Sequence, residues 1–368
     1  MQLSSFKLER YFAQYEFNVK YLLCSSDCES VTIQNLLWLE RDAHDRFLRQ
    51  WLGYTESSGA PALRQEICRL YTTIQPEQVL VHTGAEEAIF LFMRAVLQLG
   101  DHVIVHSPCY QSLLEIARSR GCEVTRWQAR ERNGWALDLD DLRRALRPNT
   151  RVIVINTPHN PTGFLMKPED FHEVNQIAQT KGVILFSDEV YRESEYRAGD
   201  RLPAACDLSA SAVSLGVMSK TYGLAGLRIG WIATHHAEVY EKMARLKDYT
   251  TICNSAPSEF LAALALQHRE KLVQRNREII WRNLDILQSF FSRYQDRFVW
   301  QRPPAGPIAF PRLLGENVET FCERLVRQAG VLLAPGTLFD DHDNHFRIGF
   351  GRKNLPEAIA RLEDFLRS

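Results

Sequence analysis

Short apolar runs alternate with helix-like segments between about residues 60 and 235, and this alternation constrains the fold more than any other feature. Such a pattern is typical of parallel strands joined by crossover helices. The runs are rich in β-branched residues and nearly continuous, as expected for strands that are buried on both faces. The predicted strands are residues 79–82, 103–106, 122–127, 151–156, 182–187, 212–217 and 228–233, and the predicted helices are residues 85–98 and 110–120.

The carboxyl-terminal third has a different pattern. After Pro257, apolar residues recur every three or four positions, which predicts a long amphipathic helical stretch. It ends before the breaker-rich segment 302–307. Further on, the pattern predicts strands at 308–313, 331–334 and 345–350, and helices at 317–329 and 355–367.

The length of the chain, 368 residues, exceeds the size at which one hydrophobic core usually keeps growing. We therefore expect two domains within an α/β fold. The larger domain, with a mostly parallel central sheet, is predicted at residues 45–256. A smaller α+β domain with an N-terminal arm is predicted at residues 1–44 plus 257–368.

Charge and cysteine content exclude several classes of function. The net charge of −1 gives no reason to expect nucleic acid or an anionic membrane as a partner. The first 17 residues carry charges throughout, and the apolar runs are too short to cross a bilayer. Cys24 and Cys28 are the only close pair of the eight cysteines, and no suitably spaced Cys or His pair accompanies them, so no metal site is predicted. We expect reduced thiols and a cytoplasmic protein.

Polar residues follow several predicted strands. Because open α/β sheets build their sites at the carboxyl ends of the strands, these residues are candidates for one shared site. Arg228 is predicted to open the next strand. The candidates at the strand ends are Asn160, Asp188, Tyr191, Ser219, Lys220 and Arg228.

The segment MSKTYGLAGLR, residues 218–228, raises the question of what Lys220 does. Lysine followed by threonine is similar to the end of a P-loop, but Ser219 stands where that motif needs glycine. The glycines at 223, 226 and 230 do not fit the dinucleotide pattern G-x-G-x-x-G. Both nucleotide-binding interpretations are therefore disfavoured.

The ordered motifs HNPTG, DEVY, SK, GLAGLR and FRIGF resemble those of the class I/II aminotransferase family, which are fold-type I enzymes that use pyridoxal 5'-phosphate. The resemblance runs from about Tyr54 to Arg347. It implies amino-group transfer between an L-amino acid and a 2-oxo acid, through a Schiff base on Lys220. It also implies a homodimer with shared active sites.

The needs of the cofactor suggest a role for each catalytic candidate. Lysine forms a Schiff base, and after exchange the freed Lys220 amine can move the substrate's α-proton. A carboxylate at Asp188 can keep the pyridine nitrogen protonated, whereas Glu189 is predicted to point to the other face of the strand. Asn160 and Tyr191 resemble the pair that hydrogen-bonds the ring's phenolic oxygen, and the 160–161 peptide is predicted to be cis.

The remaining candidates concern phosphate, ring and substrate. The amides of Gly84, Ala85 and Glu86 open a helix and can bind a dianion, with help from Ser219 and Arg228. By resemblance, Tyr110 stacks on the ring, Tyr54 reaches the neighbouring subunit's phosphate, and Arg347 clamps the substrate's α-carboxylate beside Asn160.

Two departures from the family pattern are visible. Val217 stands where many relatives have a second serine, three positions before the lysine. The segment LCSSDCESV, residues 23–31, lacks the glycine that relatives often carry where their N-terminal arm lines the substrate pocket.

Two alternatives remain open at this stage. One is a lyase or cyclase acting at the β or γ carbon of an amino acid, similar to cystathionine β-lyase or capreomycidine synthase, since these share the same electron sink. The other is a regulatory module on a retired enzyme scaffold. It is disfavoured because Lys220 is present and the residues before Tyr54 contain no basic recognition helix.

Overall fold

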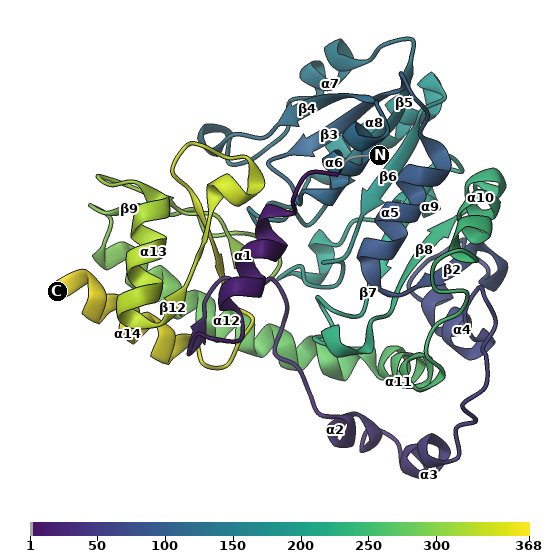
Figure 1. Cartoon of the computed structure of the whole chain (residues 1–368), viewed down its shortest axis with the longest axis horizontal. Coiled ribbons are helices and arrows are strands. Elements are labelled where there is room, and N and C mark those ends of the chain that lie inside the picture. The colour runs from purple at the N-terminus through teal and green to yellow at the C-terminus, as the bar shows by residue number, and fades with distance from the viewer. Residues whose placement is uncertain (1–2) are drawn as a thin grey trace.

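The computed structural model describes residues 3–368 and contains a seven-stranded central sheet (Figure 1). The strand order is β2-β8-β7-β6-β5-β3-β4, in which β8 runs antiparallel to both neighbours and the other pairs are parallel. All seven predicted strands are present, with ends shifted by at most two residues. They are β2 (Val79–His82), β3 (His102–Ser107), β4 (Glu123–Gln128), β5 (Thr150–Asn156), β6 (Ile184–Asp188), β7 (Ala212–Val217) and β8 (Gly230–Thr234).

The position predicted for Arg228 is wrong. Arg228 does not open β8, which begins at Gly230. It instead ends the 3-10 turn Ala225–Leu227 in a left-handed conformation, with φ at 53°. Few residues other than glycine adopt this conformation, so the turn after Lys220 fixes the arginine in a tight loop rather than in the sheet.

Helices cover both faces of the sheet. Val103 and Val105 pack against the helices of one face, whereas Ile104 packs against those of the other. Since successive side chains of a strand point to opposite faces, burial on both sides explains the continuous apolar runs. The first face carries α5 (Gly84–Val96), α6 (Ser112–Ser119) and α10 (Ala237–Lys247), and the second carries α7 (Leu139–Ala145), α8 (Pro168–Lys181) and α9 (Ala205–Leu208).

The helical stretch predicted after Pro257 consists of two helices, α11 (Ala256–Gln267) and α12 (Arg269–Arg293). α11 packs with α4 (Pro61–Cys68) in the same hydrophobic cluster as residues of β2 and β8. Residues 256–267 thus share their core with the sheet, although the sequence pattern groups most of them with the smaller domain. α12 runs from beside the sheet to the carboxyl-terminal part (Figure 1), where Leu284 and Leu287 are buried.

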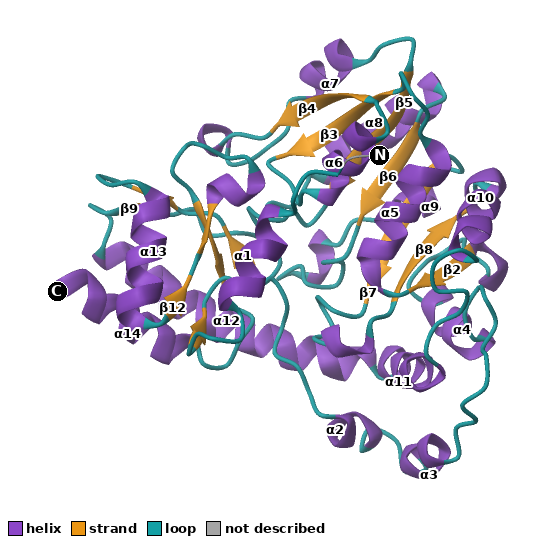
Figure 2. Cartoon of the chain, in the orientation of Figure 1, coloured by secondary structure: helices purple, strands orange, loops and turns teal. Residues whose placement is uncertain are grey.

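The carboxyl-terminal part combines short strands with helices (Figure 2). The predicted strand 308–313 is interrupted at residues 310–311, where Pro311 cannot donate a ladder hydrogen bond. β14 lies between β10 and β13, and β11 pairs with β9. The elements are β9 (Phe298–Val299), β10 (Ile308–Ala309), β11 (Arg312–Leu313), α13 (Val318–Ala329), β12 (Val331–Leu332), β13 (Ala334–Pro335), β14 (Phe346–Gly349) and α14 (Leu355–Arg367).

The N-terminal arm joins the two parts. α1 (Lys7–Tyr15) lies between them in Figure 1, and β1 (Tyr21–Leu22) adds to β12 in parallel. The chain then crosses β14, where the Gly349 amide donates to the Leu23 carbonyl at 2.9 Å. Two short helices, α2 (Ile33–Leu37) and α3 (Ala43–Leu48), lie at the edge of the molecule in Figure 1, where Leu36, Leu37 and Ala43 pack in the same cluster as α11.

Within the described residues, no helix combines the length and the apolar character that crossing a bilayer requires.

The close approach of the arm to β14 generates a prediction about stability. A Cβ atom at Gly349 would collide with the backbone carbonyl of Ser25, so we expect Gly349→Ala to displace the arm and to lower the free energy of unfolding by about 1–3 kcal/mol. Urea denaturation measures this. Gly199→Ala is the control, because a Cβ at Gly199 meets nothing within 4 Å. Equal stability of the two variants would contradict the proposed packing.

Candidate active site

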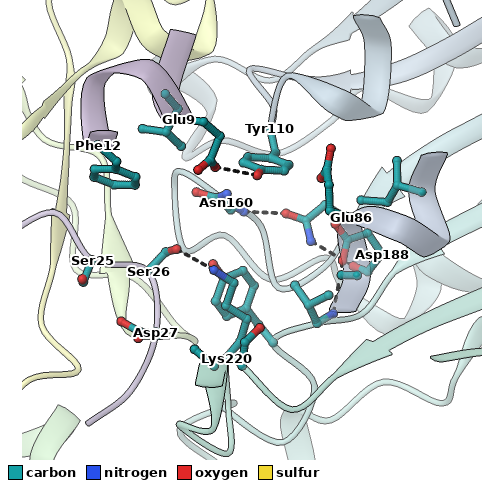
Figure 3. Close-up of a pocket in the computed structure, with 18 of the residues that line it drawn as sticks. Glu9, Phe12, Ser25, Ser26, Asp27, Glu86, Tyr110, Asn160, Asp188 and Lys220 are labelled. Carbon is teal, nitrogen blue, oxygen red and sulfur yellow. Dashed lines mark hydrogen bonds between the residues drawn. The ribbon is translucent and has the colours of Figure 1, made fainter. Parts of the chain in front are cut away.

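A cavity of about 540 Å³ lies at the carboxyl ends of β5, β6 and β7, closed on one side by the N-terminal arm. Figure 3 shows Asp188 on one side of this cavity and the arm residues Ser26 and Asp27 on the other. The cavity brings together most of the candidates that the sequence predicts. Those that line it are Ala85, Glu86, Tyr110, Asn160, Asp188, Tyr191, Ser219, Lys220, Arg228 and Arg347.

One corner of the cavity is suited to an anion. Gly84 opens α5 with φ at 82°, and a Cβ there would come within 2.5 Å of Arg228 Nη2. The guanidinium therefore lies directly against the amino-terminal turn of α5, where free amides and the helix dipole favour negative charge. Ser219 also lines the cavity. This corner combines the donors that a phosphate group needs.

Asp188 ends β6, in register with Asn156 of β5. Its carboxylate is buried and accepts one hydrogen bond, from the Val190 amide at 3.2 Å. Burial raises the pKa of Asp188 to about 7. Among residues 3–368, the Asp188 carboxyl forms no ion pair. A cation that entered the cavity beside it would favour the charged form of this carboxyl.

Glu189 points away from the cavity, as predicted. Its carboxylate accepts hydrogen bonds from the Ala205 amide at 2.9 Å and from the Ser214 hydroxyl at 2.8 Å. These contacts tie β6 to α9 and β7, so Glu189 has a structural role.

Lys220 follows β7 and projects into the cavity. Its Nζ donates a hydrogen bond to Ser26 Oγ of the arm at 2.8 Å, and desolvation lowers its pKa. A lowered pKa increases the fraction of neutral amine, which is the form that can act as a nucleophile.

Arg347 and Asn160 meet across the cavity. Arg347 is 1% exposed, and its Nη1 donates to Asn160 Oδ1 at 3.1 Å. Its Nε donates to the Cys24 carbonyl at 3.1 Å. Nη2 of Arg347 has no hydrogen-bond partner within the described chain, and the same is true of the buried Tyr191 hydroxyl. The 160–161 peptide is cis, which confirms that prediction.

Tyr110 and Tyr54 differ in position. Tyr110 lines the cavity, and its hydroxyl donates to Glu9 Oε1 at 2.8 Å. Tyr54 is 85% exposed and does not line the cavity of its own chain. The structure therefore does not bring Tyr54 to the other candidates within one subunit.

The sequence reasoning missed the contribution of residues 6–16 to the cavity wall. Only the segment 23–31 was expected near a substrate pocket. A signal was present, because Glu9, Phe12 and Glu16 are spaced by three and four residues and so share one helix face. The missed lining residues are Phe6, Leu8, Glu9, Phe12, Glu16, Ile89, Asn156, Val190 and Ala225.

Comparison with known proteins identifies the class. The profile of the family described as "Aminotransferase class I and II" matches residues 20–362. A solved PLP-dependent aminotransferase from Streptococcus suis is 34% identical, with a TM-score of 0.94 and coverage of 100% of this chain and 98% of that one. The chain belongs to the class I and II aminotransferase family. It is a pyridoxal-phosphate-dependent aminotransferase with the fold-type I architecture.

Two further relatives bear on the reaction. Capreomycidine synthase from Streptomyces vinaceus is 31% identical over 360 residues, covering 94% of this chain and 91% of that protein. The solved PLP-dependent cyclase OrfR is 27% identical, with a TM-score of 0.92 and coverage of 100% and 98%. Several aspartate aminotransferases are 25–28% identical to the chain. This chain is thus similar to enzymes named aminotransferases, to one named a synthase and to one named a cyclase.

The residues present fit pyridoxal phosphate. The anion corner at Arg228 can hold a phosphate, and the buried carboxyl of Asp188 lacks a cationic partner. The Tyr191 hydroxyl has no hydrogen-bond partner among the described residues. Each of these unmet needs matches a group of the cofactor, namely its phosphate, its ring nitrogen and its phenolic oxygen.

The raised pKa of Asp188 predicts how pH affects the cofactor-free protein. The folded state holds this proton more tightly than the unfolded state, so stability is lost as pH rises from about 4 towards 7. Asp188→Asn removes the charge. We expect the free energy of unfolding of the variant, relative to that of the unsubstituted protein, to rise by about 2–3 kcal/mol from about pH 5 to about pH 8.

Urea denaturation of cofactor-free protein at both pH values measures this gain. The exposed Asp296→Asn is the control and should show the same stability difference from the parent at both. A gain for Asp188→Asn that does not grow with pH would contradict the burial argument.

Proposed function

We propose that this aminotransferase moves an amino group between an L-amino acid and a 2-oxo acid, with Lys220 as the residue that carries the cofactor. The observation that supports this most directly is the shared cavity of the Lys220 amine, the Asp188 carboxyl and the unpartnered Nη2 of Arg347. When bound, pyridoxal phosphate supplies an electron-withdrawing ring that stabilises negative charge at the substrate's α-carbon.

Three groups of residues would hold the cofactor. The α5 amides of Gly84, Ala85 and Glu86, together with Ser219 and Arg228, would bind the phosphate. Asp188 would hold the proton of the ring nitrogen, because a carboxylate in a desolvated site favours a neighbouring cation. Asn160 and Tyr191 would donate hydrogen bonds to the phenolic oxygen, and Tyr110 would stack on the ring.

Arg347 would orient the substrate, and Lys220 would transfer its α-proton. A guanidinium is a planar fork that matches a carboxylate, and Nη2 of Arg347, which has no partner among the described residues, can donate to one. The Lys220 amine, with its pKa lowered by desolvation, would take the α-proton and return it as a general acid. The arm would exclude water from this step, since Ser26 and Asp27 wall the cavity beside Lys220.

A second candidate, a cyclase or lyase, is favoured by the similarity to capreomycidine synthase and to the cyclase OrfR. Both reactions need the same charge stabilisation at the α-carbon. The two reactions differ in their products. Amino transfer yields a 2-oxo acid and the amino form of the cofactor, whereas elimination releases ammonia or an unsaturated product. Product analysis by mass spectrometry after single turnover separates the two candidates.

We further propose that the protein is a homodimer in which Tyr54 completes the partner's phosphate site. Segment 33–54 supports this, because it exposes several large apolar side chains on and after the helices α2 and α3 at the edge of the molecule. Exposed apolar surface of this kind is typical of an interaction site. The exposed side chains are Ile33, Trp38, Leu48, Trp51, Leu52 and Tyr54.

Lys220→Ala tests the central assignment. We expect the purified variant to lose the visible absorbance of the bound cofactor and the borohydride-trapped adduct, and turnover to fall by about 10²–10⁴-fold or more. The exposed Lys181→Ala is the control and should retain both. Unchanged trapping in Lys220→Ala would overturn the assignment.

The shared site is tested by Tyr54→Phe. Loss of the hydroxyl should weaken pyridoxal phosphate binding by about 5–10-fold, in line with one hydrogen bond to a charged group. Tyr249→Phe is the control, because Tyr249 is equally exposed within one chain, at 90%. Sedimentation of the parent protein should give twice the chain mass of 42.4 kDa, and a monomer with full cofactor affinity would refute the proposal.

A further inference from the structure

The arm places two carboxylates in the cavity wall that have no cationic partner. Glu9 and Glu16 both line the cavity, and no ion pair within residues 3–368 includes either of them. Glu9 accepts one hydrogen bond, from the Tyr110 hydroxyl at 2.8 Å. No hydrogen bond of the described residues reaches the Glu16 carboxylate.

The two cations closest to Glu16, Arg352 and Lys220, each have another hydrogen-bond partner. Arg352 makes a bidentate contact with Asp27, at 2.8 and 2.9 Å, and the Lys220 amine donates to Ser26. Burial and the charges of Glu9 and Asp27 raise the pKa of Glu16, and the charges of Arg352 and Lys220 oppose this shift without cancelling it. The cavity therefore keeps an excess of negative charge on the side of the arm.

The position of Glu16 on its helix is electrostatically unfavourable. Glu16 is the C-cap of α1, where the negative end of the helix dipole disfavours an anion. Glu16 is thus unfavourable both for its helix and for its neighbour Glu9, and the charges of Arg352 and Lys220 compensate it only in part, because its pKa stays raised. A ligand would supply the missing positive charge.

A second feature independently points to a ligand in the same space. Arg347 is 1% exposed, lines the cavity and leaves Nη2 without a partner. Its guanidinium lies 5.9 Å from the centre of the Phe12 ring. Phe12 occupies the same face of α1 as Glu9 and Glu16, and all three line the cavity with Arg347, so an anion site and an acidic wall adjoin within one cavity. Figure 3 shows Glu9 and Phe12 together on the side of the arm.

We propose that the substrate is an α-amino acid with a cationic side chain, a guanidinium or an ammonium group, which Glu9 and Glu16 bind while Arg347 binds the α-carboxylate. This proposal rests on the proposed function, because it assigns the amino donor of the same site. Phe12 lies between the two carboxylates along the helix and would pack on the aliphatic stem of such a side chain.

The test uses the holoenzyme and follows the cofactor absorbance during titration with single amino acids, which gives a dissociation constant separately from turnover. L-Arginine and L-ornithine are the cationic probes, and L-citrulline is the neutral analogue of arginine with nearly the same shape. We expect at least one cationic probe to bind about ten-fold or more tightly than citrulline.

Variants of the arm assign the preference. Glu16→Gln and the double variant Glu9→Gln/Glu16→Gln should reduce the ratio of citrulline to arginine dissociation constants several-fold, with little change for citrulline itself. Glutamine at position 9 keeps an acceptor for Tyr110. Glu357→Gln, an exposed change on α14, is the control and should keep the preference of the parent.

Each outcome has a distinct consequence. Equal affinities for arginine and citrulline, or tighter binding of L-aspartate, would overturn the cationic substrate class and leave the aminotransferase assignment intact. A preference that survives in the double variant would show that other groups bind the cation and would also overturn it. A yellow holoenzyme whose spectrum no amino acid changes would refute both proposals.

Discussion

The Asp188 carboxyl and the Lys220 amine line one cavity, and among residues 3–368 neither forms an ion pair. Desolvation raises the pKa of the first and lowers that of the second, so both are driven towards their neutral forms. Such groups are costly to bury unless a partner compensates them. The sheet sustains this cost because both residues stand at the ends of central strands, held by the hydrogen bonds of β6 and β7 with their neighbours.

The N-terminal arm turns an open strand edge into an enclosed site. Its residues contact both ends of the polar machinery: Ser26 accepts from Lys220, and the Cys24 carbonyl accepts from Arg347. The same segment is anchored to β14 through Leu23 and Gly349. The arm therefore couples the carboxyl-terminal part, which supplies Arg347, to the sheet that supplies Lys220. It also brings the acidic wall of Glu9 and Glu16 to the space where a substrate side chain would lie.

We propose separate functions for the residues at the strand ends, which would bind the cofactor, and for the arm, which would select the substrate. The residues at the strand ends are proposed to meet needs that enzymes using this cofactor share, and the chain is similar both to an aminotransferase and to a cyclase. The arm faces the other side of the cavity, away from Asp188 (Figure 3). Differences in reaction and substrate among such relatives are therefore expected to arise from side chains like Phe12 and Glu16, not from the ring-binding set.

The sequence by itself determined the seven strands to within two residues and the strand-end positions of Asn160, Asp188 and Lys220, because two-sided burial and local turn motifs are written in short segments. Local sequence patterns gave wrong or missing predictions where contacts between distant segments determine the structure. They placed Arg228 in a strand, ran one helical stretch through the break at His268, and gave no role to Glu9 or Glu16. Only the tertiary structure set the arm against the strand ends, since that contact joins residues more than 190 positions apart, such as Ser26 and Lys220. No periodicity within a single segment encodes a meeting of that kind.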